Sequence, residues 1–159
     1  MIELQPVAAE DWPEFRAGAL RMYVDQLSRA GLGTVEELQG MAEGDIGHLL
    51  PDGPATVDNQ LYWLRAGSER VGVLWFAVRR ERPPPRGFVY ALEIFPSFQR
   101  RGYGAEAMRE VDRLAAQLGV ENIGLSVFSY NAPAIRLYEK LGYSATAQQM
   151  NKRIPPTTK

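Results

Sequence analysis

The segment between residues 88 and 119 constrains the fold more than any other part of the sequence. It opens with the apolar run Phe88–Phe95, which predicts a strand that ends at Pro96. Gly102 and Gly104 follow and lead into a helical pattern, in which apolar residues recur every three or four positions. Glycines at the start of a helix let an anion approach the free N–H groups of the first turn, where the helix dipole also favours negative charge. The sequence therefore predicts a strand, an anion-binding turn and a helix.

Basic side chains beside the glycines strengthen this interpretation. Arg100 and Arg101 would give an anion two cationic partners. Two other interpretations are weaker: the glycines could only ease packing, or they could belong, with Ala107, to the dinucleotide fingerprint G-x-G-x-x-A. The dinucleotide fingerprint needs a tight turn directly after the strand, but residues 97–101 separate Pro96 from the first glycine.

A second block of sequence follows downstream. Residues 122–128 predict a strand, and residues 131–143 (NAPAIRLYEKLGY) predict a helix. The first block, Q-x-x-G-x-G-A over residues 99–105, and the second, N-x-x-A-x-x-L-Y-x-x-x-G-Y, resemble in this order two motifs of the GNAT superfamily of N-acetyltransferases. The resemblance covers roughly residues 88–143.

The first half of the chain fits the order of elements in that superfamily. Residues 2–7 predict a short strand, two helical patterns follow up to about residue 49, and Thr34 to Glu37 reads as a capping box that opens the second helix. Residues 60–64 and 71–78 predict strands, and the second is so apolar that we expect it to be buried on both faces.

The resemblance implies an α/β (α+β) fold with a mixed, mostly antiparallel sheet of six or seven strands and helices on both faces. Its two central strands would splay apart to admit the cofactor. We expect residues 1–159 to form a single GNAT-type domain, since this length is usual for one domain. We also expect residues 151–156 to complete the last strand.

The resemblance also implies which residues bind acetyl-CoA as the acyl donor. The backbone of Ile94 and Phe95 would pair with the pantetheine arm, and the Ile94 N–H would polarise the thioester carbonyl and stabilise the oxyanion. Asn131 would cap its helix and also lie beside the pantetheine. Gln99 and Arg100 would lie at the edge of the diphosphate, which the backbone N–H groups of five residues would cradle: Arg101, Gly102, Tyr103, Gly104 and Ala105.

Tyr138 is the predicted general acid. A free thiol titrates near 8.5 and a phenol near 10, so a tyrosine hydroxyl can hydrogen-bond to or protonate the departing sulfur. The general base is less clear: Glu93 precedes the predicted oxyanion donor, but strand alternation points it to the opposite face unless a bulge re-aims it. Tyr90 and His48 are further candidates for the base.

Composition excludes several kinds of site. Without cysteine, and with His48 as the sole histidine, the chain offers no thiolate nucleophile and no Cys- or His-rich metal centre, so we expect direct transfer and no metal. A formal net charge of −1 and the lack of a long apolar run argue against nucleic-acid and membrane partners. With no signal peptide at its start, the chain is expected to be cytoplasmic.

The predicted function is therefore N-acetyl transfer from acetyl-CoA to a primary amine in a ternary complex. The expected acceptor is a small-molecule amine, with a protein amine as the variant, and a homodimer is possible because such assembly is common in the superfamily. The alternative is a catalytically inactive module that binds acyl-CoA as a sensor or partner protein.

Overall fold

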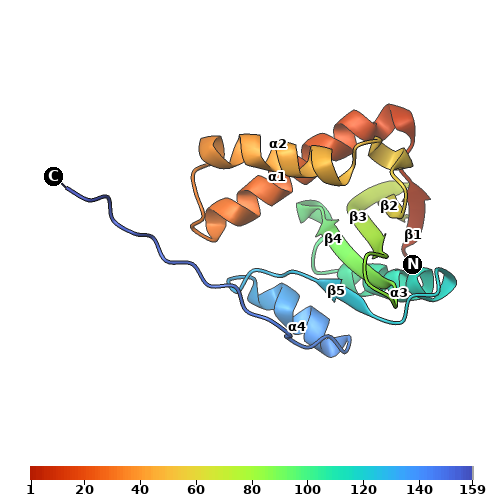
Figure 1. Ribbon diagram of the computed structural model, residues 1–159. Helices are drawn as coiled ribbons and strands as arrows, with labels where there is room; N and C mark the ends of the chain where they lie inside the picture. Colours follow the sequence, from red (N-terminus) through yellow and green to blue (C-terminus); the bar gives the residue numbers. More distant parts are fainter. Residues whose placement is uncertain (159) are drawn as a thin grey trace.

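The computed structural model describes residues 1–158 and contains one mixed sheet (Figure 1). Its five strands lie in the order β1-β2-β3-β4-β5, which is also their order in the chain. The first four pair antiparallel, and β5 pairs parallel with β4. The strands are β1 (Glu3–Pro6), β2 (Asn59–Ala66), β3 (Glu69–Arg79), β4 (Arg86–Ile94) and β5 (Ile123–Leu125).

Helices cover both faces of the sheet, as the resemblance implied (Figure 1). One face carries the packed pair α1 (Trp12–Arg29) and α2 (Val35–Leu49), and the other carries α3 (Tyr103–Gln117) and α4 (Ala132–Lys140). Three short 3-10 turns complete the elements: Ala9–Asp11, Gly53–Ala55 and Pro96–Phe98.

The central strand β3 is buried on both faces, as its sequence predicts. Val73 and Trp75 pack with α1 and α2, whereas Leu74 and Phe76 pack with α3. This division follows from the alternation of side chains along a strand. The predicted capping box is also confirmed, because the Thr34 hydroxyl accepts from the N–H of Glu37 while the Glu37 carboxylate accepts from the N–H of Thr34.

The predicted number of strands differs from the structure. Residues 1–158 contain five strands rather than six or seven. The predicted strand over residues 122–128 shortens to β5, because β5 diverges from β4 after the pair Val89–Leu125. Residues 144–158, expected to complete the sheet, adopt no helix or strand and run away from the body of the molecule (Figure 1).

None of the helices within residues 1–158 combines the length and the apolar character that crossing a bilayer requires.

Candidate active site

The start of α3 presents unpaired backbone N–H groups. Gly102 caps the helix with φ +81°, a left-handed conformation that glycine adopts without strain. The N–H of Glu106 donates to the Gly102 carbonyl at 3.1 Å. In the part of the chain that the structure describes, the N–H groups of Tyr103, Gly104 and Ala105 have no backbone acceptor. The turn can therefore donate several hydrogen bonds to one anion.

The side chains before Gly102 have distinct positions. The Gln99 amide donates to the Ile94 carbonyl at 2.9 Å, which ties the turn to the end of β4. The Arg101 guanidinium donates to the Ser97 carbonyl at 3.1 Å. Arg100 is exposed, and its φ of +63° turns the backbone sharply into the loop. The Arg101 guanidinium is thus held in the loop just before α3.

The two glycines of the turn meet different surroundings. A Cβ on Gly102 would have no heavy atom within 4 Å, so its left-handed φ, and not crowding, calls for glycine there. A Cβ on Gly104 would lie 3.2 Å from a terminal carbon of Leu137 on α4. The lack of a side chain at Gly104 thus leaves room for Leu137 of α4, and the expectation that both glycines also make room for an anion stays a prediction.

A slot opens where β4 and β5 diverge. Beyond the pair Val89–Leu125 the strands enclose a cavity of about 100 Å³. Residues 89–92 of β4 and 125–128 of the β5 end form two of its walls, α4 contributes Asn131, Ala134 and Tyr138, and α1 contributes Met22 and Gln26. Two strands thus splay apart as the resemblance implied, but β5 lies at the edge of the five-stranded sheet and not at its centre.

The end of β4 leaves one candidate backbone donor at this slot. The N–H of Phe95 donates to the Val71 carbonyl at 2.8 Å, and the Phe95 carbonyl accepts from the N–H of Phe98. Because successive N–H groups of a strand point to opposite edges, the N–H of Ile94 faces away from β3, toward the slot. Leu92 shares this edge by the same alternation, and it lines the cavity. Both backbone groups of Phe95 are thus occupied within the chain.

Asn131 and Tyr138 form the α4 wall of the cavity. The Asn131 side chain caps α4 by accepting from the N–H of Ala134 at 3.3 Å, as predicted. Tyr138 is half-buried, its ring lies 5.8 Å from that of Tyr143, and burial raises the pKa of its hydroxyl above the usual 10. The phenol therefore stays protonated near neutral pH and can donate a proton.

Glu93 lies beside α1 and does not line the cavity. Burial raises the pKa of its carboxyl above 4.5; nearby Arg21 opposes this shift and Asp25 adds to it. The strand bulge that could re-aim Glu93 lies elsewhere, because Trp75 faces Ala91 and Phe76 faces Val89, which leaves Tyr90 as the extra residue.

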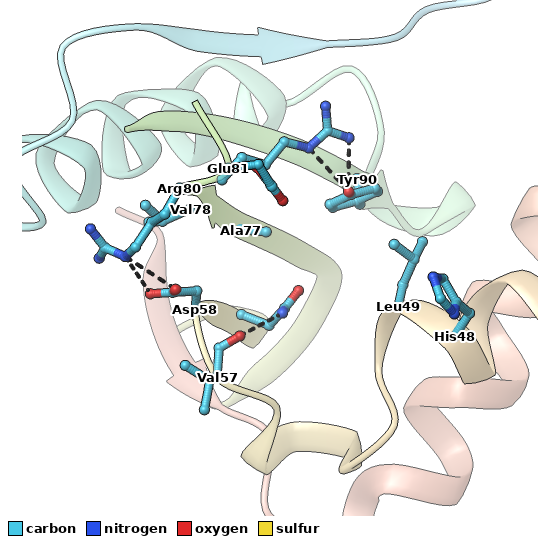
Figure 2. A pocket seen from close by; sticks show the side chains of 11 residues that line it. His48, Leu49, Val57, Asp58, Ala77, Val78, Arg80, Glu81 and Tyr90 are labelled. Carbon is cyan, nitrogen blue, oxygen red and sulfur yellow. Dashed lines mark hydrogen bonds and ion pairs between the residues drawn. The ribbon is translucent and has the colours of Figure 1, made fainter. Parts of the chain in front are cut away.

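A second hollow, of about 290 Å³, is also lined by Tyr90 (Figure 2). His48, at the end of α2, and the residues that begin the β3–β4 connection line it. His48 is exposed.

Three residues that line the smaller cavity, Leu92, Met22 and Gln26, were not predicted from the sequence. Sequence patterns could have found Leu92, because it lies two residues before Ile94 on the same strand edge. No local signal marks Met22 and Gln26, which α1 contributes.

Comparisons with known proteins agree with this geometry. The model of the Acetyltransferase (GNAT) family matches residues 36–143. Two relatives from Bacillus subtilis (strain 168) are described as uncharacterized N-acetyltransferases. YycN is 27% identical over 96% of this chain and 99% of its own. YdgE is 28% identical over 95% of this chain and 97% of its own.

Solved structures show the same fold. The crystal structure of YycN superimposes with a TM-score of 0.91 at 27% identity, and covers 98% of this chain and 100% of that one. The aminoglycoside N-acetyltransferase AAC(6')-Iy in complex with CoA gives a TM-score of 0.65 at 13% identity, over 97% of this chain and 95% of that one. At this identity the second likeness concerns the fold alone.

Proposed function

Because the chain belongs to the GNAT family of acetyltransferases, we propose that it transfers an acetyl group from acetyl-CoA to a primary amine by direct attack in a ternary complex. The observation that carries the proposal is that one chain has both free N–H groups at the start of α3 and a cavity between β4 and β5 that Tyr138 lines. In the transfer, the amine nitrogen bonds to the thioester carbonyl carbon, the carbon–sulfur bond breaks, and the thiolate takes up a proton.

The chain offers groups that fit each part of acetyl-CoA. The N–H groups of residues 101–105 would bind the diphosphate, with Gln99 and Arg100 at its edge. The slot between β4 and β5 would hold the pantetheine arm, with Asn131 beside it. The Ile94 N–H would polarise the thioester carbonyl. The fit is chemical as well as steric, since free amides and guanidinium groups meet the two phosphates and a narrow cavity meets the thin arm.

Tyr138 would protonate the departing sulfur. Its raised pKa keeps the hydroxyl protonated in the working range, and its position on the cavity wall supports this role. Glu93 would accept the proton of the amine through water, since it lies outside the cavity. A raised carboxyl pKa brings the group closer to the pH at which a general base is most effective.

Replacing Tyr138 by phenylalanine tests the proposal. The Tyr138→Phe variant should release thiol from acetyl-CoA about a hundredfold more slowly, which is the usual contribution of a general acid, and should bind CoA as tightly as the wild type. Tyr143→Phe, whose ring contacts that of Tyr138, is the matched control and should keep full turnover. Unchanged turnover in Tyr138→Phe would remove this residue from the mechanism.

A catalytically inactive acyl-CoA sensor is the competing candidate. A thiol-release assay over a panel of amines separates the two: CoA binding without turnover of any amine would favour the sensor. The half-buried phenol on the cavity wall favours the enzyme, because a protein that only binds CoA has no need of a proton donor at that point.

The acceptor is proposed to be a small-molecule amine, with a protein amine as the variant. Structural neighbours include an aminoglycoside acetyltransferase in complex with CoA, which supports amine acetylation as a use of this fold. A panel of polyamines, aminoglycosides and peptides with free N-termini, each tested with acetyl-CoA, would identify the class by its kcat/KM. The cytoplasmic location, and the lack of nucleic-acid and membrane partners, stay predictions from the sequence.

The proposed assembly is a homodimer. Residues 144–158 are exposed and belong to no helix or strand, and Met150 and Ile154 on this segment are 85% and 71% exposed. Packing of this segment against a second copy would bury both side chains. Light scattering on the full chain should give twice the mass of one copy, and a monomer at all concentrations would refute this assembly.

A further inference from the structure

Tyr90 is shared by the small cavity and the second hollow. Among residues 1–158 it is the one that lines both the cavity of about 100 Å³ between β4 and β5 and the hollow of about 290 Å³ beside His48, which Figure 2 shows. Tyr90 therefore belongs to the border of both the narrow space and the larger one.

The ring of Tyr90 is held on two sides by other aromatic rings. It stacks on Trp75, with ring centroids 4.5 Å apart and an angle of 25° between the planes. The edge of Phe88 meets it at 4.7 Å and 63°. Trp75 is itself buried, and its indole N–H donates to the Asn59 side chain at 2.8 Å. The ring therefore rests on a fixed support.

The hydroxyl of Tyr90 is held as well. Arg79 donates to it through both Nε, at 3.2 Å, and Nη2, at 2.7 Å (Figure 2). The same guanidinium lies 3.8 Å from the ring centre of Phe88. Since a fork of two donors and a cation–π contact fix one geometry, the phenol has little freedom to swing aside.

A strand bulge explains the position of this side chain. Tyr90 is the extra residue of β4 opposite Trp75 and Phe76. A bulge bends its strand and re-aims the side chain that it carries. Tyr90 directly follows the last pair between β4 and β5, so it lies at the point where the slot begins.

We propose that Tyr90 sets the length of the acyl group that the slot accepts. This inference rests on the proposed function, because it takes the thioester carbonyl to lie at the Ile94 N–H and its acyl group to extend into the cavity beside Tyr138. With the phenol in place, the acyl chain has only the small cavity, which suits an acetyl group. Without it, the cavity and the hollow become one space, and a longer acyl chain can extend toward His48 and Leu49. Tyr90 is a specificity residue in this account, and it takes no part in proton transfer.

The test compares acetyl-, butyryl- and hexanoyl-CoA as donors for the wild type, Tyr90→Ala and Tyr90→Phe. A single methylene in a tight pocket changes kcat/KM by roughly 10- to 200-fold. The wild type should therefore use hexanoyl-CoA at least tenfold less well than acetyl-CoA, and Tyr90→Ala should raise the hexanoyl-to-acetyl ratio at least tenfold. Tyr90→Phe keeps the ring on Trp75 and should keep the wild-type ratio.

A second variant and a second measurement make the test independent of catalysis and of folding. Tyr90→Leu keeps apolar contact with Trp75 and should raise the ratio in the same direction if Tyr90→Ala does not fold. Calorimetry gives the affinities for the same acyl-CoA series and therefore the hexanoyl-to-acetyl ratio without turnover. A wild type that binds these compounds but transfers no acyl group would refute the proposed function, and the affinity ratios of the variants would still test whether Tyr90 limits the acyl chain. An unchanged hexanoyl-to-acetyl ratio in a folded Tyr90→Ala or Tyr90→Leu protein would overturn it.

Discussion

Replacing Gly72 by alanine should disturb the candidate site from the opposite edge of β4. Gly72 lies on β3 opposite Ile94, and a Cβ there would overlap the carbonyl oxygen of Glu93. It would also lie 3.1 Å from the carbonyl carbon of Glu93 and 3.2 Å from the Cα of Ile94. These are backbone atoms, so no side-chain rotation relieves the overlap and the end of β4 itself must move.

The size of both effects follows from this geometry. Overpacking a core costs about 1–3 kcal/mol, and a clash with backbone belongs at the upper end, so we expect a loss of about 3 kcal/mol in the free energy of unfolding. Moving the Ile94 N–H by about 1 Å should slow acetyl transfer roughly a hundredfold. Urea denaturation and thiol release from acetyl-CoA measure the two effects.

The matched control is Gly44→Ala on α2, where a Cβ would meet no heavy atom within 4 Å. Alanine favours a helix over glycine by about 1 kcal/mol, so this variant should be at least as stable as the wild type and fully active. If Gly72→Ala kept both the stability and the turnover of the wild type, the close approach of β3 and β4 at Ile94 would be refuted.

Three further predictions test separate parts of the structure. Because burial raises the pKa of Glu93, the folded protein holds this proton to higher pH than the unfolded chain, and the wild type loses stability as pH rises past about 4.5. Glu93→Gln should thus gain stability over the wild type between pH 4 and pH 7 in urea titrations; the same difference at both pH values would contradict the shift. Tyr143→Phe removes a buried hydroxyl that has no hydrogen-bond partner within residues 1–158, so thermal unfolding should show a gain of about 1 kcal/mol, whereas Tyr23→Phe breaks the bond to Asp45 at 3.1 Å and should lose about 1 kcal/mol. Gly104→Val places a branched side chain against Leu137, so it should lower the free energy of unfolding by about 1–3 kcal/mol and weaken CoA binding in calorimetry. Gly104→Ala should have a smaller effect on both. Equal CoA affinity in the wild type and both variants would show that Gly104 is not part of the CoA site.

Local patterns predicted the elements whose cause is local. The capping box from Thr34 to Glu37 and the cap at Asn131 depend on atoms three residues apart, and both were found from the sequence. The apolar run within β3 also predicted that this strand is buried, because a strand covered on both faces carries apolar side chains on both.

Features set by distant contacts could not be found in this way. The strand count depends on what residues 144–158 pair with, and the length of β5 depends on where it leaves β4. Likewise, the bond from the Phe95 N–H to the Val71 carbonyl joins residues far apart in the chain, so the motif could not show that this N–H is already occupied, whereas that of Ile94 faces away from β3.

Binding of the diphosphate at the start of α3 is the claim on which the account depends, and the amide signals of residues 101–105 report on it directly. Labelled protein would be titrated with CoA and, separately, with pantetheine, which has the same arm but no diphosphate. The account predicts large amide shifts at residues 101–105 with CoA, and with pantetheine shifts only along the slot between β4 and β5. Saturating CoA that leaves residues 101–105 unshifted would contradict it.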